Sequence, residues 1–289
     1  MKRRVSVIFM ILAVAVAVVP HGSKAFQSEE RRQRNRQEVE RERDRSRDHD
    51  SDSQGDLLER EETKQSYELS RGARVEVSGI NGSVEIETGN VNSAEVHIIR
   101  SANDRADLEY RKIIVEHTPD SLVVRGEKDR ERNSAGRNRQ VRQRVMMKIP
   151  RQVDLVASGV NGRVNVGAVD GPVKVSGVNG KVDVAQARGY SHISGINGKV
   201  SITITELGER GIHVSGINGG VELQFAEELN ADLDVSGVNG TVSPEVANVT
   251  IQGKLERGNF RAKIGSGGSS ISVSGVNGRV RLSRVGATG

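Results

Sequence analysis

The sequence contains no cysteine and no tryptophan, and only three tyrosines and four phenylalanines among its 289 residues. Without cysteine the chain can form no disulfide, no thiolate metal site and no lipid-modified N-terminal cysteine. A wide globular core usually relies on aromatic side chains to fill its volume, so their scarcity favours a thin core lined by valine and isoleucine. Recognition of neutral sugars by aromatic stacking is disfavoured for the same reason.

An excess of one sign of charge is also lacking. The chain has 43 lysines and arginines against 38 acidic residues, a formal net charge of +5. Both signs are abundant, so charge alone does not indicate a nucleic-acid partner. We therefore expect no specific nucleic-acid binding.

Long apolar runs are absent apart from residues 5–19, which follow a basic start at positions 2–4. With the small residues Ser23 and Ala25 after it, this run predicts a secretory signal peptide over residues 1–25. The run of about 15 residues is shorter than the ~20 that a membrane-spanning helix needs, although retention as an anchor is the alternative. The expected protein is exported to the periplasm, the cell surface or the extracellular medium, with no transmembrane span once the signal is cleaved.

Two segments are densely charged. Residues 26–66 are rich in arginine, glutamate and aspartate and nearly lack apolar side chains. Such a segment cannot bury enough apolar surface to offset its ordering entropy, which predicts a disordered linker. The second segment, residues 125–144, holds eight basic residues against three acidic ones. We interpret it as a loop inserted into a β-repeat domain that covers residues 67–289.

The dominant feature is an internal repeat, the pentapeptide Ser-Gly-(Ile/Val)-Asn-Gly. Its seven copies begin at Ser78, Ser158, Ser176, Ser194, Ser215, Ser236 and Ser274. Their successive spacings are 80, 18, 18, 21, 21 and 38 residues. A period of about 20 residues indicates a repeat architecture, in which the first gap corresponds to four units and the last to two.

Apolar and polar residues alternate around each copy. The residue before the serine is apolar, as at Val77 and Val175, and the second residue after the pentapeptide is always valine, as at Val84 and Val182. Period-two alternation in β-branched residues is typical of half-buried strands, here on both sides of a glycine-rich corner.

Two architectures are compatible with this pattern. Asn-Gly is a preferred two-residue hairpin turn, but in a hairpin the flanking valines would turn the central isoleucine or valine of the motif toward solvent. In a solenoid, a bend at Ser-Gly returns that residue to the interior, and coils stack about 4.8 Å apart. We therefore predict an all-β fold, a single-stranded, β-helix-like β-solenoid with coils of about 20 residues.

The Asn-Gly pairs are the expected structural turns of this solenoid, and their asparagines are expected to form a hydrogen-bonded ladder. The turn residues are Asn81, Gly82, Asn161, Gly162, Asn179, Gly180, Asn197, Gly198, Asn218, Gly219, Asn239, Gly240, Asn277 and Gly278. On the last coil, Arg279, Arg281 and Arg284 are expected to protect the end strand against edge pairing.

The repeated Gly-(Ile/Val)-Asn-Gly-x-Val units, as in residues 176–184, and the closing segment 258–282 resemble a bacterial adhesin-domain family of unknown function. The resemblance covers about residues 67–285. It implies an exported β-repeat fold in the cell envelope and a role in surface interaction. It carries no catalytic or ligand-binding residues to this chain.

Catalytic groups are not clustered in the sequence. Outward acids such as Asp183 and Glu222 alternate with Asn165 and Ser201, whereas glycoside hydrolysis requires paired carboxylates. The glycine-rich corners are not followed by the Gly-Lys-Ser/Thr of a phosphate loop. We therefore expect no enzyme, no catalytic residues and no cofactor.

We also expect no metal site, and the nearest candidate is a set of three residues at equivalent outward positions. His192, His213 and Asp234 would supply two imidazoles and a carboxylate to a divalent metal if their coils stack in sequence order. The plainer interpretation is an outward polar column, since Glu76 and Ser272 occupy the same position in other copies.

A basic column follows Asn-Gly in three successive copies, at Arg163, Lys181 and Lys199. Stacked cations of this kind could bind an anionic polymer such as acidic polysaccharide, lipid headgroups or DNA. Ordinary solvated charge is the alternative, because Gly220 and Thr241 hold this position in neighbouring copies.

Together these features predict a non-enzymatic, exported cell-envelope protein, an adhesin-like structural and interaction module. Its partners would be envelope or surface polymers or other proteins. The alternative is a periplasmic scaffold that self-associates through its end strands. A carbohydrate-active enzyme on a solenoid is the third hypothesis.

Overall fold

The computed structural model describes residues 58–128, 141–187, 189–226, 228–245, 249–256 and 258–285. The predicted signal peptide and most of the predicted linker lie outside these residues. Within the described part of the chain, no helix has the length and apolar character needed to cross a membrane.

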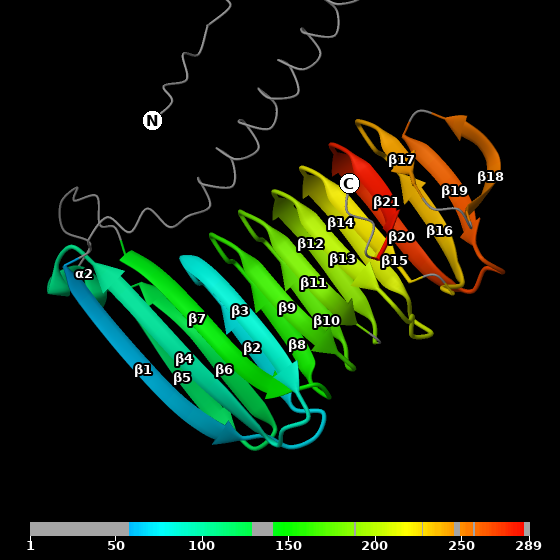
Figure 1. Ribbon diagram of the computed structural model, residues 1–289. Helices are drawn as coiled ribbons and strands as arrows, with labels where there is room; N and C mark the ends of the chain where they lie inside the picture. The colour runs from blue at the N-terminus through cyan, green and yellow to red at the C-terminus, as the bar shows by residue number, and fades with distance from the viewer. Residues whose placement is uncertain are drawn as a thin grey trace, which may run out of the picture. The chain divides into compact units, whose positions relative to one another are not determined.

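The described chain is all-β, as predicted, and its strands form two large sheets (Figure 1). Sheet A has ten strands, in the spatial order β1 (Glu59–Glu68), β4 (Ser93–Ala102), β7 (Val141–Pro150), β3 (Gly82–Gly89), β9 (Val164–Val169), β11 (Val182–Ala187), β13 (Val200–Ile204), β15 (Val221–Phe225), β21 (Val280–Arg284) and β17 (Val242–Pro244). Sheet B has eleven, in the order β18 (Val249–Glu256), β19 (Asn259–Ile264), β16 (Ala231–Ser236), β20 (Ser269–Asn277), β14 (Ile212–Asn218), β12 (Ser191–Asn197), β10 (Val173–Ser176), β8 (Asp154–Ser158), β2 (Arg74–Ser78), β6 (Ser121–Lys128) and β5 (Arg111–Thr118). A short helix, α2 (Arg105–Tyr110), connects β4 to β5.

Each pentapeptide joins a strand of sheet B to a strand of sheet A. We call the two strands and the corner between them a rung. Neighbouring rungs are parallel and in register, so that Val164, Val182 and Val200 lie side by side. Because the strands before and after Asn-Gly belong to different sheets, the hairpin alternative is wrong.

The core lies between the two sheets and is lined mainly by valine, isoleucine and leucine. The central isoleucine or valine of the motif is buried in all seven copies, namely Ile80, Val160, Val178, Ile196, Ile217, Val238 and Val276. Each such side chain contributes on the order of 1.5–3 kcal/mol relative to an exposed position. Aromatic residues are rare in this core, where Phe225 and Phe260 are buried.

The order of the rungs departs from the sequence at both ends of the molecule. The β2–β3 rung lies between β6–β7 and β8–β9, and the amide of Gly79 donates to the carbonyl oxygen of Ser158 at 3.1 Å. The expectation that four stacked units fill the first gap is therefore wrong, because the copies on either side of the gap are neighbours. Similarly, the β20–β21 rung lies between β14–β15 and β16–β17.

The insertion of β20–β21 also corrects the expected role of three arginines. β21 pairs with β15 on one side and with β17 on the other. Arg279, Arg281 and Arg284 therefore do not lie on an end rung, and protection of the end strand by these residues was a wrong prediction.

The predicted linker ends in a strand rather than continuing to residue 66. β1 pairs with β4 along its whole length in antiparallel register. Its charged side chains form cross-strand ion pairs, Glu61 with Arg100 and Lys64 with Glu95. Backbone hydrogen bonds to β4 stabilise this segment although it has few apolar side chains to bury. Exposed charged side chains are typical of an edge strand.

The predicted loop at residues 125–144 is shorter than expected. β6 extends to Lys128 and β7 begins at Val141, so both ends of this segment are strand. The rest of the segment, residues 129–140, lies outside the described residues.

Candidate functional site

The seven asparagines of the repeat form one continuous column on the exposed corner. Each side-chain Nδ2 donates to the Oδ1 of the next asparagine at 2.8–3.3 Å. The donors follow the order Asn239, Asn277, Asn218, Asn197, Asn179, Asn161 and Asn81, and the last donates to the carbonyl oxygen of Val141 at 2.7 Å. All six amide–amide bonds point the same way, and the column crosses both places where rung order departs from the sequence.

The glycines of the corner allow the backbones of neighbouring rungs to approach closely. A Cβ placed on Gly180, whose φ is +151°, would lie 2.2 Å from the carbonyl oxygen of Gly162. The same contact recurs along the column, with Gly198 at 2.1 Å from the oxygen of Gly180. Only glycine tolerates both this dihedral and this approach.

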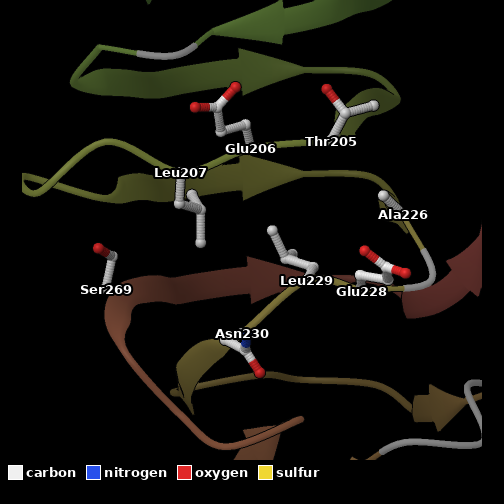
Figure 2. A pocket seen from close by; sticks show the side chains of 8 residues that line it. All are labelled: Thr205, Glu206, Leu207, Ala226, Glu228, Leu229, Asn230 and Ser269. Carbon is white, nitrogen blue, oxygen red and sulfur yellow. The ribbon is translucent and has the colours of Figure 1, made fainter.

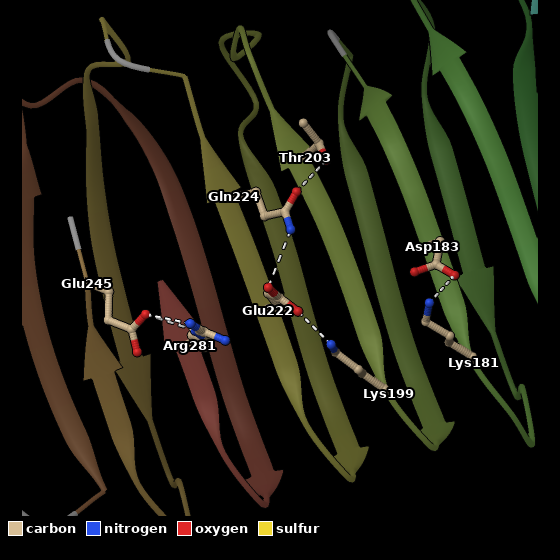
Figure 3. A network of polar contacts seen from close by, with 8 residues as sticks. All are labelled: Lys181, Asp183, Lys199, Thr203, Glu222, Gln224, Glu245 and Arg281. Atoms are coloured by element: carbon tan, nitrogen blue, oxygen red, sulfur yellow. Dashed lines mark hydrogen bonds and ion pairs between the residues drawn. The ribbon is translucent and has the colours of Figure 1, made fainter. Parts of the chain in front are cut away.

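The predicted basic column lies on sheet A beside a mixed polar column that contains Asp183 and Glu222. Lys181 pairs with Asp183 at 3.0 Å, and Lys199 pairs with Glu222 at 2.6 Å (Figure 3). The hydrogen bond from Lys199 lowers the pKa of the Glu222 carboxyl, opposed by partial burial. Two of the three predicted cations are thus neutralised by carboxylates, which weakens their attraction for an anionic polymer. Arg163 lies at the same register position on the preceding rung.

The ion pairs of sheet A extend into a polar network. The amide of Gln224 donates to Glu222 at 3.3 Å, and the hydroxyl of Thr203 donates to Gln224 at 3.3 Å (Figure 3). Two rungs away in sequence, Arg281 donates to Glu245 at 2.7 Å. On this part of the outer face of sheet A, charged and amide side chains therefore satisfy one another.

On sheet B, the structure brings together two members of the metal candidate and separates the third. His192 and His213 are paired in register, with ring centroids 5.2 Å apart and planes inclined by 8°. Ser272 of the inserted strand β20 lies between His213 and Asp234. Asp234 instead forms an ion pair with Arg261, whose Nε lies 3.0 Å from the Asp234 carboxylate. Among the described residues, no group of three or more potential metal-binding side chains is present.

The two imidazoles have cationic and aromatic neighbours. Lys174 is paired in register with His192 on its other side. Tyr190 stacks against His192 at 6.2 Å, and the guanidinium carbon of Arg210 lies 4.7 Å from the centre of the tyrosine ring. Burial, the neighbouring His213 and Lys174 together lower the pKa of His192, burial most strongly. These positive neighbours favour an anion over a metal cation at this place.

Tyr190 and Arg210 were not among the candidate residues taken from the sequence. Tyr190 precedes His192 by two positions, so period-two alternation places it on the same face. Arg210 stands in the segment between β13 and β14, and no periodicity predicts where it lies.

A hollow of about 650 Å³ lies on the side opposite the asparagine column, at the links that join β13 to β14 and β15 to β16 (Figure 2). Its lining comprises Thr205, Glu206, Leu207, Ala226, Glu228, Leu229, Asn230 and Ser269. Figure 2 shows the side chains of Leu207 and Leu229 turned toward each other, whereas the carboxylate of Glu206 points away from them. Two leucines and two separated acids form no recognisable catalytic arrangement.

Comparison with known proteins gives distant structural similarity alone. No family model and no curated protein matches the sequence. A solved structure from Clostridium sporogenes, provisionally named a cell adhesion protein, shares 12% identity, with a TM-score of 0.46 over 78% of this chain and 100% of that one. A provisionally named adhesin from Bacteroides fragilis shares 11% identity, with a TM-score of 0.32 over 77% of this chain and 97% of that one. Similarity at this level is too low to transfer a binding partner.

Proposed function

We propose that this chain is a non-enzymatic, exported module of the cell envelope, a β-solenoid that presents a long, regular surface to a partner in the manner of an adhesin. The observation that carries the proposal is the unbroken asparagine column. Seven corners with the same Asn-Gly pair stand in one row, about one strand spacing or 4.8 Å apart. A repetitive, rigid surface of this kind suits binding to a repetitive partner rather than chemistry at one point.

The polar contacts on the outer face of sheet A support the same role. Its ion pairs hold Lys181 and Lys199 against carboxylates of the same or the adjacent rung. Such a face stays hydrated and keeps its shape without a ligand. Export is inferred from the signal-like residues 1–25, and the absence of cysteine leaves backbone and side-chain ladders to stabilise the exported domain.

The edges of sheet A favour presentation over end-to-end self-association. β1, at one edge, carries exposed charged side chains along most of its length. β17, at the other, is three residues long and ends in Pro244, which offers no backbone N–H. Charge, shortness and proline are the features that discourage pairing with another edge strand.

The test is surface accessibility in the native host. A C-terminal tag on the full chain should be labelled by antibody, and cut by protease, on intact cells. A variant without residues 1–25 serves as the control and should be protected until cells are lysed. Protection of the full chain on intact cells would contradict surface presentation, and filaments that form with rising concentration would favour the scaffold.

A further inference from the structure

We propose that Lys174, His192 and His213 form a binding site for an acidic polysaccharide, which binds more tightly as the two imidazoles take up protons. We call these three residues the cation row. Tyr190 and Arg210 flank it. This site deepens the proposed function by naming the class of ligand, and it rests on that function for its biological setting.

The cation row follows from strand register. β10, β12 and β14 are adjacent and parallel, and their pairing aligns Lys174 with His192 and His192 with His213. The three side chains therefore stand on the outer face of sheet B at intervals of about 4.8 Å. The imidazole planes are nearly parallel, inclined by 8°. Three groups that can carry positive charge thus lie in a straight line.

No carboxylate neutralises this line. Val156 and Ser272 occupy the same column on the two flanking strands. The next acids in the column, Glu76 and Asp234, each form an ion pair with a neighbouring arginine, at 3.1 Å and 3.0 Å. Among the described residues, none of the three cations forms an ion pair. This distinguishes the cation row from the basic column of sheet A.

The flanking groups add polar contacts suited to a sugar. The hydroxyl of Tyr190 lies 3.4 Å from Nδ1 of His192, and Arg210 covers the tyrosine ring at 4.7 Å. The loop that holds Arg210 also carries Glu206 and Glu209. On β12, the next residue on the same face as His192 is the uncharged Ser194.

Proton uptake and anion binding are coupled at this site. Protonating either imidazole places a positive charge beside another cation, which is unfavourable in the absence of a ligand. An anion laid along the row removes this repulsion, so anion binding and proton uptake by His192 favour each other. By linkage, binding is strongest at pH values below the lowered pKa of His192 in the free protein and weakens as the pH rises through the higher pKa in the complex.

The shape and charge of the row favour a linear acidic polysaccharide over duplex DNA. The row extends about 10 Å, two strand intervals, across the outer face of sheet B. An extended sugar chain with carboxylates on its units can meet successive cations while its hydroxyls contact Tyr190. Tight DNA binding typically draws on about 6–10 phosphate contacts, more than three cations supply.

The experiment measures binding of purified full-length protein to polygalacturonate, with neutral dextran as the control polymer. Affinity for polygalacturonate should be about tenfold higher near pH 5 than near pH 8, as expected for two exposed charge contacts. The double variant H192Q/H213Q should bind weakly and equally at both pH values. The matched double variant H97Q/H117Q removes two other histidines and should retain the pH dependence.

Several results would overturn the proposal. These are equal binding at both pH values, unchanged binding by H192Q/H213Q, loss of binding on adding a chelator, or tighter pH-dependent binding to duplex DNA. Circular dichroism of each variant verifies the fold, and K174Q provides a second variant that should weaken binding at both pH values. Surface labelling of cells is independent of these outcomes, so failure of the site and failure of the proposed function are distinguishable.

Discussion

The central rungs and the end rungs follow different chain orders but share one corner. From β8 to β15, each rung lies beside its successor in the sequence. At the ends, β2–β3 and β20–β21 are inserted between rungs that come from other parts of the chain, and Figure 1 shows β21 in red between β15 and β17. The asparagine column nevertheless continues without a break through both regions.

This difference separates the contacts that hold neighbouring rungs together from those that decide which rungs become neighbours. The corner contacts recur between neighbouring copies of the motif, so they stabilise any neighbour that carries it. Order is set by the connecting segments. β19 follows β18 in an antiparallel pair and occupies the outer edge of β16. The next rung, β20–β21, can therefore add to sheet B only at the inner edge of β16.

The largest expected effect is an all-or-none cross-link that reads the rung order directly. Ser215 and Ser274 are register partners, whereas Ser236 lies two strands from Ser215. Because the chain has no cysteine, S215C/S274C should form a single intramolecular disulfide under mild oxidation. S215C/S236C should not, since its Cα atoms are roughly 10 Å apart and disulfides require less than about 7 Å. Peptide mapping without reductant gives the answer, and the reverse pattern would mean that the rungs stack in sequence order.

Two adjacent glycines at the junction of the centre and the C-terminal end provide a matched pair. A Cβ on Gly219 would lie 2.1 Å from the carbonyl oxygen of Gly198, while one on Gly220 would lie 3.5 Å from that of Arg279. G219A should therefore lower the free energy of unfolding by about 2–4 kcal/mol. G220A should change it by less than about 1 kcal/mol. Urea denaturation measures both, and similar losses would show that the close approach at the corner is not decisive.

The sequence predicts the features that depend on contacts within a rung. Alternation around Val77 and Val84 places them inward, and both are buried. The prediction of an all-β fold is confirmed, and so is the burial of the central isoleucine or valine. These features are local, because period two along a strand decides which face each side chain occupies.

Rung order and the end strands could not be predicted in this way. Identical motifs do not distinguish one neighbour from another, so spacing alone suggests sequence order. β1 looks like a disordered segment because its composition is charged, and it becomes a strand through pairing with β4. Such pairing depends on residues far away in the sequence.

The same distinction holds for the site on sheet B. Equivalent positions in successive central rungs bring His192 beside His213. Asp234 belongs to an end rung, where the inserted β20 separates it from His213. Arg210 stands in a link between sheets, and its place over Tyr190 depends on the folded structure.

A smaller effect compares the middle of the asparagine column with its end. Asn197 donates to Asn179 and accepts from Asn218, both at 3.0 Å, whereas Asn239 makes one bond within the column, at 3.3 Å. N197A should lower the free energy of unfolding by about 1–2 kcal/mol, since it breaks two hydrogen bonds. N239A should cost about half as much. Urea denaturation of the two purified variants under one condition tests this. Equal losses of unfolding free energy would mean that the number of hydrogen bonds within the column does not determine its contribution to stability.

The smallest expected effect is a pH dependence of stability that arises at His192 in the central rungs. The pKa of His192 is lowered in the folded chain by burial, by His213 and by Lys174, so between the folded and unfolded values the unfolded chain binds more protons. The free energy of unfolding therefore rises with pH through this window, which ends near the ordinary imidazole pKa of about 6.5. H192Q should flatten the rise measured by urea denaturation between about pH 5 and 7.5, while S272A, an uncharged neighbour of His213, should retain it. If the free energy of unfolding of H192Q rises with pH as steeply as that of the unmodified protein, groups other than His192 cause the pH dependence. The central and end rungs would then not differ in this electrostatic property.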